Sequence, residues 1–308
     1  MASIPTVERN HVGLTVVRAS IKISHREPLL VTTIALLTDF GTQDAYVGIM
    51  KGVIANINPQ ARVVDITHAI PPGDIRRAAF ELWRAAPYFP QGTIFLTVVD
   101  PGVGGTRLPI AISWPGRICV GPDNGLFTYL LTQEQAVSAI ALTEKEYLLD
   151  TISETFHGRD VFAPSAAHLS LGVHLPLLGP PLEDPIRLPL PRLQVIEGET
   201  IHGEILHADR FGNLITSIGI LRKEANELVI HPWLPDCPSL RLPHDKVQVS
   251  LPGMEHLSLS RTYGDVPEGE LAAYIGSAGL LEIAVNKGSA EYQLAISSGQ
   301  EIQLGLRG

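Results

Sequence analysis

Cysteine is scarce in this chain of 308 residues: only Cys119 and Cys237 are present, far apart and with no CxxC pair. Two isolated cysteines exclude a disulfide framework and a cysteine-based zinc site. Such low cysteine usage is typical of a protein from a reducing compartment, so we expect a cytoplasmic protein.

Long apolar runs and basic clusters are also missing. The longest apolar run, LLVTTIALL at positions 29–37, is too short to span a bilayer. The net charge of −9, with no run of Lys and Arg, argues against nucleic-acid binding. A signal peptide is not indicated either, because four basic residues interrupt the first 28 positions: Arg9, Arg18, Lys22 and Arg26. We therefore expect no nucleic-acid or membrane partner, and interpret residues 1–30 as an N-terminal extension.

The remaining composition is that of a globular protein, with 45% hydrophobic and 18% charged residues. From about position 31, short β-branched runs (TTIALL, ARVVDITH and TIFLTVVD) alternate with segments of helical spacing (DAYVGIMKGVIANINP and DIRRAAFELWRAAPYFP). This strand–helix alternation predicts right-handed crossovers and a largely parallel sheet. The N-terminal domain is thus expected to be α/β.

A change in the residue pattern, from helical spacing to short alternating runs, predicts a domain boundary near position 190. The segment LPLLGPPLEDPIRLPLPRL holds six prolines in 19 residues. Beyond it come short alternating runs separated by turn residues, which are typical of an antiparallel sheet or a small β-barrel. We therefore expect an α/β domain over residues 31–190 and a β-barrel domain over residues 191–308.

Acidic residues end all three strands predicted in the first domain: Asp39, Asp65 and Asp100. In a parallel sheet these ends share one edge, which is where open α/β sheets bind ligands. Each of the three could instead cap the next helix or hold a turn.

The segment VDPGVGGTR, residues 99–107, places Asp100 and Arg107 on either side of three glycines. The flexible loop allows the two side chains to fold back and pair, which would fix the guanidinium; a purely structural ion pair is the alternative. A phosphate cradle is disfavoured, because it needs a helix directly after the loop, and the next segment, LPIAISWPG, has a strand pattern.

Two further loops carry candidate functional groups. ETFHGRD places His157 beside a glycine, and RFGN offers Phe211 as a flat apolar face and Asn213 as a paired donor and acceptor. The latter pair suits a purine ring, although FGN could also be a simple hairpin turn. Five hard ligands could in principle bind a metal, but no HxH, HExxH or DxD spacing supports such a site, and we expect none: Asp39, Asp65, His68, Asp100 and His157.

Six blocks in order resemble the S-adenosyl-L-methionine (SAM) hydroxide adenosyltransferases, which are related to the bacterial fluorinases and chlorinases. The blocks span positions 33 to 305 approximately: LTDFGTQDAYVGIMKGVIANINPQARVVDITHAI, FPQGTIFLTVVDPGVGGTR, VGPDNGL, ETFHGRDVFAPSAAHL, DRFGNLITS and GSAGLLEIAVNKGSA. The resemblance implies a homotrimer that binds SAM where the first domain of one subunit meets the second domain of its neighbour. It also implies the reaction, in which water or hydroxide attacks C5′ of SAM to give adenosine and L-methionine, with no cofactor because SAM is the substrate.

The resemblance also assigns roles to individual residues. The family's catalytic triad falls on Asp100, Arg107 and His157. From their chemistry we expect Arg107 to orient the water and His157 to accept its proton, since an unperturbed imidazole has a pKa near 6.5. The acid that binds the ribose falls on Asp39. Contacts to adenine and methionine fall on the remaining positions: Asp44, Tyr46, Asp209, Phe211, Asn213, Ser277, Glu282 and Val285.

Halogenation and simple binding are the alternatives within this reading. The halogenating relatives carry Tyr at the place of Asp100 and a Tyr-Ser pair at the place of His157-Gly158, and an aromatic residue of the fluorinases is replaced here by Gly73. The differences at Asp100 and at His157-Gly158 favour hydrolysis, whereas the one at Gly73 leaves open what packs against the ribose. A non-catalytic SAM or adenosine sensor would need Asp39 and Asn213 but neither Arg107 nor His157.

Overall fold

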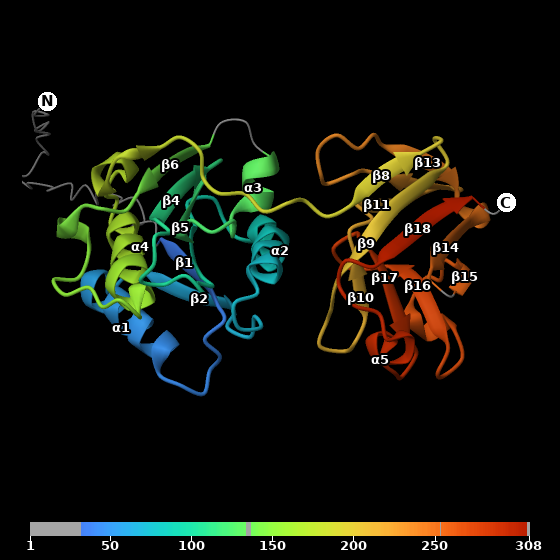
Figure 1. The fold of residues 1–308 in the computed structure, drawn as a ribbon, viewed down its shortest axis with the longest axis horizontal. Helices are drawn as coiled ribbons and strands as arrows, with labels where there is room; N and C mark the ends of the chain where they lie inside the picture. Colours follow the sequence, from blue (N-terminus) through green and yellow to red (C-terminus); the bar gives the residue numbers. More distant parts are fainter. Residues whose placement is uncertain (1–31, 134–136, 253, 307–308) are drawn as a thin grey trace, which may run out of the picture. The chain divides into compact units, whose positions relative to one another are not determined.

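The computed structural model describes residues 32–133, 137–252 and 254–306. The expected N-terminal extension, residues 1–30, lies outside these ranges. Residues 33–182 build a sheet of seven strands, and residues 193–306 build the remaining sheets (Figure 1).

The first sheet has the strand order β2-β1-β3-β5-β4-β6-β7. Strands β2, β1, β3 and β5 are parallel, as the alternation of strands and helices predicted, whereas β4, β6 and β7 are antiparallel to their neighbours. The direction changes because a tight turn at Pro115-Gly116, with Gly116 at a φ of 69°, joins β4 directly to β5. The strands are β1 (Thr33–Thr38), β2 (Arg62–Thr67), β3 (Ile94–Val98), β4 (Pro109–Trp114), β5 (Arg117–Pro122), β6 (Ser138–Ala141) and β7 (Pro181–Leu182).

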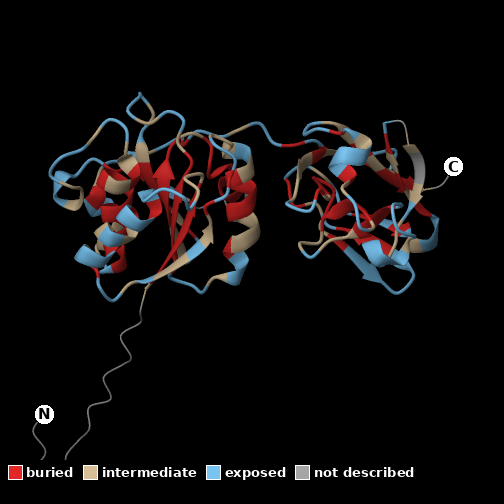
Figure 2. Cartoon of the chain, turned by 90° about the horizontal axis from the view of Figure 1, so that it is seen from below, coloured by how far each residue is buried: buried red, intermediate tan, exposed pale blue. Residues whose placement is uncertain are grey.

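Helices cover both faces of this sheet (Figure 1): α1 (Tyr46–Ile57) and α4 (Ala163–Ser170) on one face, α2 (Ile75–Ala85) and α3 (Thr128–Gln133) on the other. Alternate residues of β1 point to opposite faces, so Ile34 packs with α1 and α4 while Ala35 packs with α2 and α3. Both faces are buried (Figure 2), which explains why the strand reads as a continuous apolar run. No helix within the described ranges is long and apolar enough to cross a membrane.

The C-terminal half is antiparallel and almost barrel-shaped, as expected from the sequence. One sheet has the order β15-β14-β18-β9-β10-β17-β16, with β8 beside β9. A bridge between Leu259 and Ala273 joins the region after β15 to β16, and so nearly closes the sheet. The strands are β8 (Leu193–Ile196), β9 (Thr200–Ala208), β10 (Leu214–Thr216), β14 (Val247–Leu251), β15 (Met254–Ser258), β16 (Leu271–Ile275), β17 (Leu281–Val285) and β18 (Glu301–Leu306).

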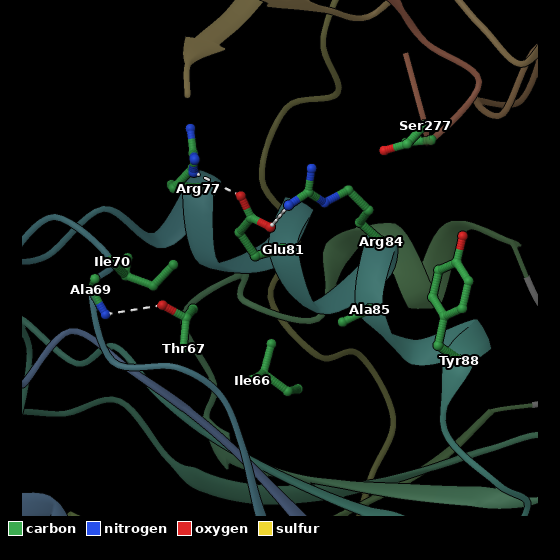
Figure 3. Close-up of a pocket in the computed structure, with 11 residues that line it drawn as sticks. Ile66, Thr67, Ala69, Ile70, Arg77, Glu81, Arg84, Ala85, Tyr88 and Ser277 are labelled. Atoms are coloured by element: carbon green, nitrogen blue, oxygen red, sulfur yellow. Dashed lines mark hydrogen bonds and ion pairs between the residues drawn. The ribbon is translucent and has the colours of Figure 1, made fainter. Parts of the chain in front are cut away.

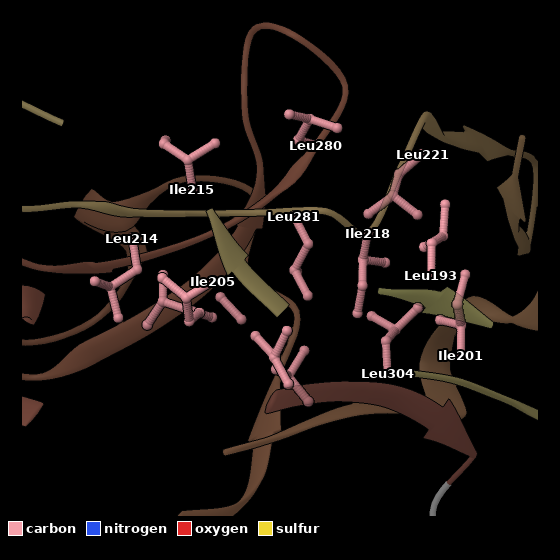
Figure 4. Close-up of a cluster of buried hydrophobic side chains, with 14 of the residues drawn as sticks. Leu193, Ile201, Ile205, Leu214, Ile215, Ile218, Leu221, Leu280, Leu281 and Leu304 are labelled. Atoms are coloured by element: carbon pink, nitrogen blue, oxygen red, sulfur yellow. The ribbon is translucent and has the colours of Figure 1, made fainter. Parts of the chain in front are cut away.

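The inside of this sheet is filled by apolar residues, which alternate with polar ones along the strands. Along β9, Ile201, Gly203 and Ile205 are buried, while His202 and Glu204 between them are partly exposed. The two isoleucines pack in one cluster with Leu214, Leu281 and Leu304 from three other strands (Figure 4). A separate three-stranded sheet and a short helix complete the fold: β11 (Leu221–Glu224), β12 (Glu227–Ile230), β13 (Leu240–Pro243) and α5 (Ala290–Leu294).

Candidate functional site

The structure brings Asp100, Arg107 and His157 together in one cluster. Arg107 Nε donates to both carboxylate oxygens of Asp100, at 2.9 and 3.0 Å, and Nη2 also donates to Oδ2. The same Nη2 lies 2.7 Å from Nδ1 of His157. The Asp100 and Arg107 side chains are only 5% and 8% exposed, so the pair is shielded from water and its interaction is weakly screened.

A glycine explains how this loop reaches His157. Gly104 has a φ of 74°, and a Cβ atom there would lie 2.3 Å from the carbonyl oxygen of Glu154. Only a residue without a side chain allows this close approach and this backbone conformation together. Gly104 therefore docks the loop of Asp100 and Arg107 against the segment that carries His157.

The hydrogen bond to Arg107 fixes the tautomer of His157. A guanidinium has only donors, so Nδ1 of His157 must accept, and the neutral ring carries its hydrogen on Nε2. Burial lowers the pKa of His157, and the positive charge of Arg107 lowers it further. Nδ1 therefore carries the only lone pair of the ring that could take a proton, and this lone pair already accepts the hydrogen bond from Arg107. For His157 to accept a proton, as the sequence analysis expected, this hydrogen bond would have to break.

A buried carboxylate holds the loop before His157. Asp160 is fully buried, accepts a hydrogen bond from the backbone N–H of Ser153 at 2.8 Å, and pairs with Arg159. Burial raises the pKa of Asp160, but these contacts outweigh it and hold the pKa below its usual value. The Arg159 guanidinium lies 5.4 Å from the centre of the Phe156 ring. By pairing with Arg159, Asp160 therefore also helps to hold Phe156, the residue before His157.

A cavity of about 170 Å³ lies against the cluster and has an aromatic wall. The rings of Phe40, Tyr46 and Phe156 are 5.2 to 5.9 Å apart, centre to centre. Pockets for drug-sized ligands usually measure about 300–1,000 Å³, so this cavity encloses only part of such a ligand. Nη1 of Arg107 is buried and has no hydrogen-bond partner in the described part of the chain. Arg107 itself does not line the cavity, which the cluster reaches through Asp100 and His157.

Asp39 lies near the same loop, whereas Asp44 is exposed at the start of α1. The Asp39 carboxylate accepts a hydrogen bond from the backbone N–H of Gly73 at 2.8 Å. A Cβ atom on Gly73 would be 3.7 Å from Pro101, the residue after Asp100. One carboxylate oxygen of Asp39 is thus held in place, and the other has no hydrogen bond in the described chain.

Four of the residues assigned to adenine and methionine line a second cavity, of about 580 Å³: Asp209, Phe211, Asn213 and Val285. Asp209 orders this loop, because its side chain accepts hydrogen bonds from the backbone N–H groups of Phe211 and Asn213 at 2.8 and 3.0 Å. The Phe211 ring is 74% exposed and so presents an open apolar face. Within one chain, this cavity shares no lining residue with the cavity beside Arg107.

Ser277 and Glu282 do not line that second cavity. Ser277 faces a third pocket, of about 500 Å³, opposite the ion pairs that Glu81 makes with Arg77 and Arg84 (Figure 3). Glu282 is buried and accepts a hydrogen bond from the Tyr274 hydroxyl at 2.7 Å. Burial raises the pKa of Glu282 above its ordinary value.

Asp65 and His68 are not part of the cluster, although the sequence placed Asp65 at the shared edge. Asp65 lies inside β2 rather than after it, and it pairs with Lys51 at 2.7 Å. Nδ1 of His68 is 2.8 Å from Oγ1 of Thr38. Throughout the ranges that the structure describes, no group of three or more His, Cys, Asp or Glu side chains is arranged to hold a metal ion.

Sequence reasoning missed the aromatic wall and the backbone donor to Asp39. Phe40 and Phe156 are the direct neighbours of Asp39 and His157, and that adjacency was the available signal. Gly73 had no such signal, because only the folded chain brings its N–H group to a carboxylate 34 positions earlier.

The fold and the site define an α/β protein with a nearly closed β-barrel, in which a buried acid–guanidinium–imidazole cluster lies beside a partial ligand cavity. The family model of the SAM hydroxide adenosyltransferase N-terminal domain matches residues 34–179, and that of the C-terminal domain matches residues 203–303. The chain therefore belongs to the SAM hydroxide adenosyltransferase family.

Named relatives cover most of the chain. It is 43% identical over 279 residues to the (R)-S-adenosyl-L-methionine hydrolase of Thermus thermophilus, covering 87% of this chain and 97% of the relative. Identity to the hydrolase of the same name from Salinispora arenicola is 40%, covering 88% and 97%. A fluorinase of Nocardia brasiliensis is 26% identical, covering 88% and 96%.

Solved structures give the same picture of the fold. A crystal structure of a conserved protein from Thermotoga maritima matches with a TM-score of 0.76 and 35% identity, covering 88% of this chain and 99% of that one. The crystal structure of a conserved protein from Thermus thermophilus matches with a TM-score of 0.67 and 41% identity, covering 89% and 99%.

Proposed function

We propose that this protein is an enzyme that hydrolyses SAM to adenosine and L-methionine, through attack of water or hydroxide at C5′. Support comes from relatives named as SAM hydrolases that are 37–43% identical over 87–88% of the chain. The observation that carries the chemistry is the buried Asp100–Arg107–His157 cluster, in which Arg107 keeps an N–H unpaired among the described residues and Asp100 and His157 line a cavity.

The difficult part of this reaction is the nucleophile. The sulfonium of SAM leaves as a neutral thioether, so the leaving group needs neither a proton nor a metal, and we propose that no cofactor takes part. Water must be held in line with the C5′–S bond, and positioning of this kind can contribute about 7–11 kcal/mol. A guanidinium next to that water stabilises its hydroxide form.

We assign the roles accordingly. Asp100 fixes the plane of Arg107, and the free Nη1 of Arg107 donates to the attacking water. His157 donates through Nε2 while its Nδ1 remains bound to Arg107, so it orients the hydroxide rather than serving as the base. This differs from the role of proton acceptor that the ordinary pKa of an imidazole suggested for His157. The proton that water gives up passes to bulk solvent, while the C5′–S electron pair stays on the sulfur of methionine.

The substrate would be held by residues from both halves of the chain. Asp39 binds the ribose hydroxyls, since a carboxylate can accept two hydrogen bonds. Phe211 and Asn213 hold adenine, and Asp44 and Tyr46 contact the methionine end. The remaining assigned residues contribute to the adenine and methionine contacts: Asp209, Ser277, Glu282 and Val285. Because the two cavities within one chain are separate and one is small, we propose a cytoplasmic homotrimer whose sites combine both halves from different subunits.

Halogenation is the competing reaction, since fluorinases are among the relatives. The halogenating enzymes are expected to carry Ser where this chain has Gly158. A Cβ atom on Gly158 would lie 3.1 Å from the Phe156 ring and 3.2 Å from Sδ of Met50, so a serine side chain would fit only if these neighbours moved. The packing therefore favours water over halide.

Product analysis in oxygen-18 water tests the proposal. We expect the label in the 5′-hydroxyl of adenosine, methionine without label, and an unchanged rate when a chelator is added or when chloride or fluoride is present. A 5′-halogenated nucleoside, label in methionine, or loss of activity with the chelator would overturn it. Arg107→Ala is the control for adenosine formed without the enzyme.

A further inference from the structure

Thr38 and His68 form a buried contact at the end of β1, directly before the site residues Asp39 and Phe40. Thr38 is fully buried and His68 is 6% exposed. Oγ1 of Thr38 lies 2.8 Å from Nδ1 of His68 and accepts a hydrogen bond from the backbone N–H of Phe40 at 3.3 Å. The hydroxyl thus connects the imidazole to the backbone of the substrate loop.

His68 holds the same loop a second time through its backbone. Its carbonyl oxygen accepts a hydrogen bond from the N–H of Gly41 at 2.8 Å. Asp39 and Phe40 therefore lie between two points that His68 fixes, one through Thr38 and one through Gly41. Neither contact involves the cluster around Arg107.

Asp65 and Lys51 support the imidazole from the other side. Nε2 of His68 lies 3.1 Å from Oδ1 of Asp65, although its N–H is not aligned for a hydrogen bond. Oδ2 of Asp65 accepts from Lys51 on α1, the helix that follows the loop. The carboxylate favours a hydrogen on Nε2, which leaves Nδ1 as an acceptor for the Thr38 hydroxyl. The Thr38 hydroxyl then donates to Nδ1, and the Nε2–H faces the Asp65 carboxylate without an aligned hydrogen bond.

We propose that His68 is a positioning residue for substrate: through Thr38 and Gly41 it sets the place of the Asp39–Phe40 loop and hence the grip of Asp39 on the ribose hydroxyls. The ribose part rests on the proposed function, whereas the order of the loop does not. Asp65 and His68, which the sequence marked as possible metal ligands, thereby acquire a role that needs no metal.

Amide hydrogen exchange tests the loop without any substrate. Thr38→Val keeps the shape of the side chain but removes the hydroxyl, and we expect exchange at Phe40 to accelerate about tenfold or more. Thr38→Ser keeps the hydroxyl and should restore protection. If Thr38→Val does not fold, His68→Leu removes the imidazole and should have the same effect. Unchanged exchange at Phe40 in either folded variant would overturn the proposal.

Thr216 offers a matched control. It is also fully buried, and its hydroxyl also accepts a backbone N–H two residues later, from Ile218, but in the β-barrel half. Thr216→Val should lower stability as Thr38→Val does while leaving exchange at Phe40 unchanged. Accelerated exchange at Phe40 in this control would mean that general destabilisation, rather than the contact with His68, explains the result.

Binding of nucleosides tests the grip on the ribose. In Thr38→Val we expect the Kd of adenosine to rise about tenfold and that of 2′,3′-dideoxyadenosine, which lacks both hydroxyls, to change less than about twofold. The KM for SAM should rise while kcat changes little. Equal weakening of both nucleosides would refute the positioning role. If the wild-type protein neither binds adenosine nor consumes SAM, the proposed function fails, and exchange at Phe40 still decides the order of the loop.

Discussion

Arg107 divides its donors between three tasks, and this division makes it the most sensitive residue of the cluster. Nε and Nη2 are used by Asp100 and His157, while Nη1 has no partner in the described part of the chain and is proposed to donate to the attacking water. Removing one positioned donor to a developing charge typically lowers kcat by about 10²–10³. We therefore expect Arg107→Ala to lower kcat/KM for adenosine release by at least about 10².

Lysine should not rescue this position, because an ammonium cannot reproduce the planar fork that Asp100 binds. Arg241→Ala is the matched control, since Arg241 also pairs with carboxylates, those of Glu224 and Glu227, but its side chain is exposed. Its kcat/KM should stay within about twofold of wild type. An active Arg107→Ala protein would contradict the assigned role of the guanidinium.

The pKa of His157 predicts the acid limb of the pH profile. Burial and Arg107 lower this pKa below 6.5, so the ring is neutral at pH 7 and the contact through Nδ1 is intact. As pH falls through the lowered pKa, protonation at Nδ1 breaks that contact, and the folded state also loses stability relative to the unfolded state, which binds the proton more readily. We expect kcat/KM to be flat from pH 8 to about 6.5 and to decline below it.

The profile is best measured against His157→Asn, which retains an acceptor that does not titrate in this range. The acid limb should disappear or shift in this variant. An acid limb with an apparent pKa well above 6.5 in wild type would contradict the lowered pKa of His157 and the neutral-donor role assigned to it.

At the scale of elements, Gly104 is essential for the close contact between the loop of Asp100 and Arg107 and the segment that carries His157. Ala at this position would meet the Glu154 carbonyl and would also be strained, since a left-handed backbone costs a residue with a Cβ about 1–2 kcal/mol. Gly92→Ala carries the strain alone, because its φ is 81° and nothing lies within 4 Å of the added atom. We expect both variants to lose stability in denaturant titrations, but only Gly104→Ala to lose most of its activity.

The elements that sequence alone could place are those with a strong period. The first three strands and the helices between them follow their apolar patterns, and β1, β2 and β3 are parallel as predicted. The antiparallel half of the sheet could not be predicted, because β6 and β7 are only 4 and 2 residues long and carry little pattern.

The same limit applies to the candidate site. The pairing of Asp100 with Arg107 could be anticipated since only seven residues separate them. Asp65 was misplaced by two residues, which moved it from the end of β2 into the strand. The contact between Thr38 and His68 spans 30 positions, so nothing local in the sequence indicated it.

At the scale of the whole molecule, the separate cavities predict complementation between subunits. Arg107→Ala and Asp209→Ala chains should each be nearly inactive alone. If sites combine halves from neighbouring subunits, co-expressed chains in equal amounts should have about one quarter of their sites intact. The checking measurement is SAM hydrolysis by the co-purified mixture, with a mixture of separately folded proteins as control. No recovery would place both halves of the site within one chain.

The small cavity beside Arg107 also bears on when the protein is active. If a single subunit encloses only a fragment of SAM, subunits that dissociate on dilution are inactive. Activity then depends steeply on the protein concentration. A newly synthesised subunit would then not consume SAM until it associated with other subunits, so that assembly itself would activate the enzyme.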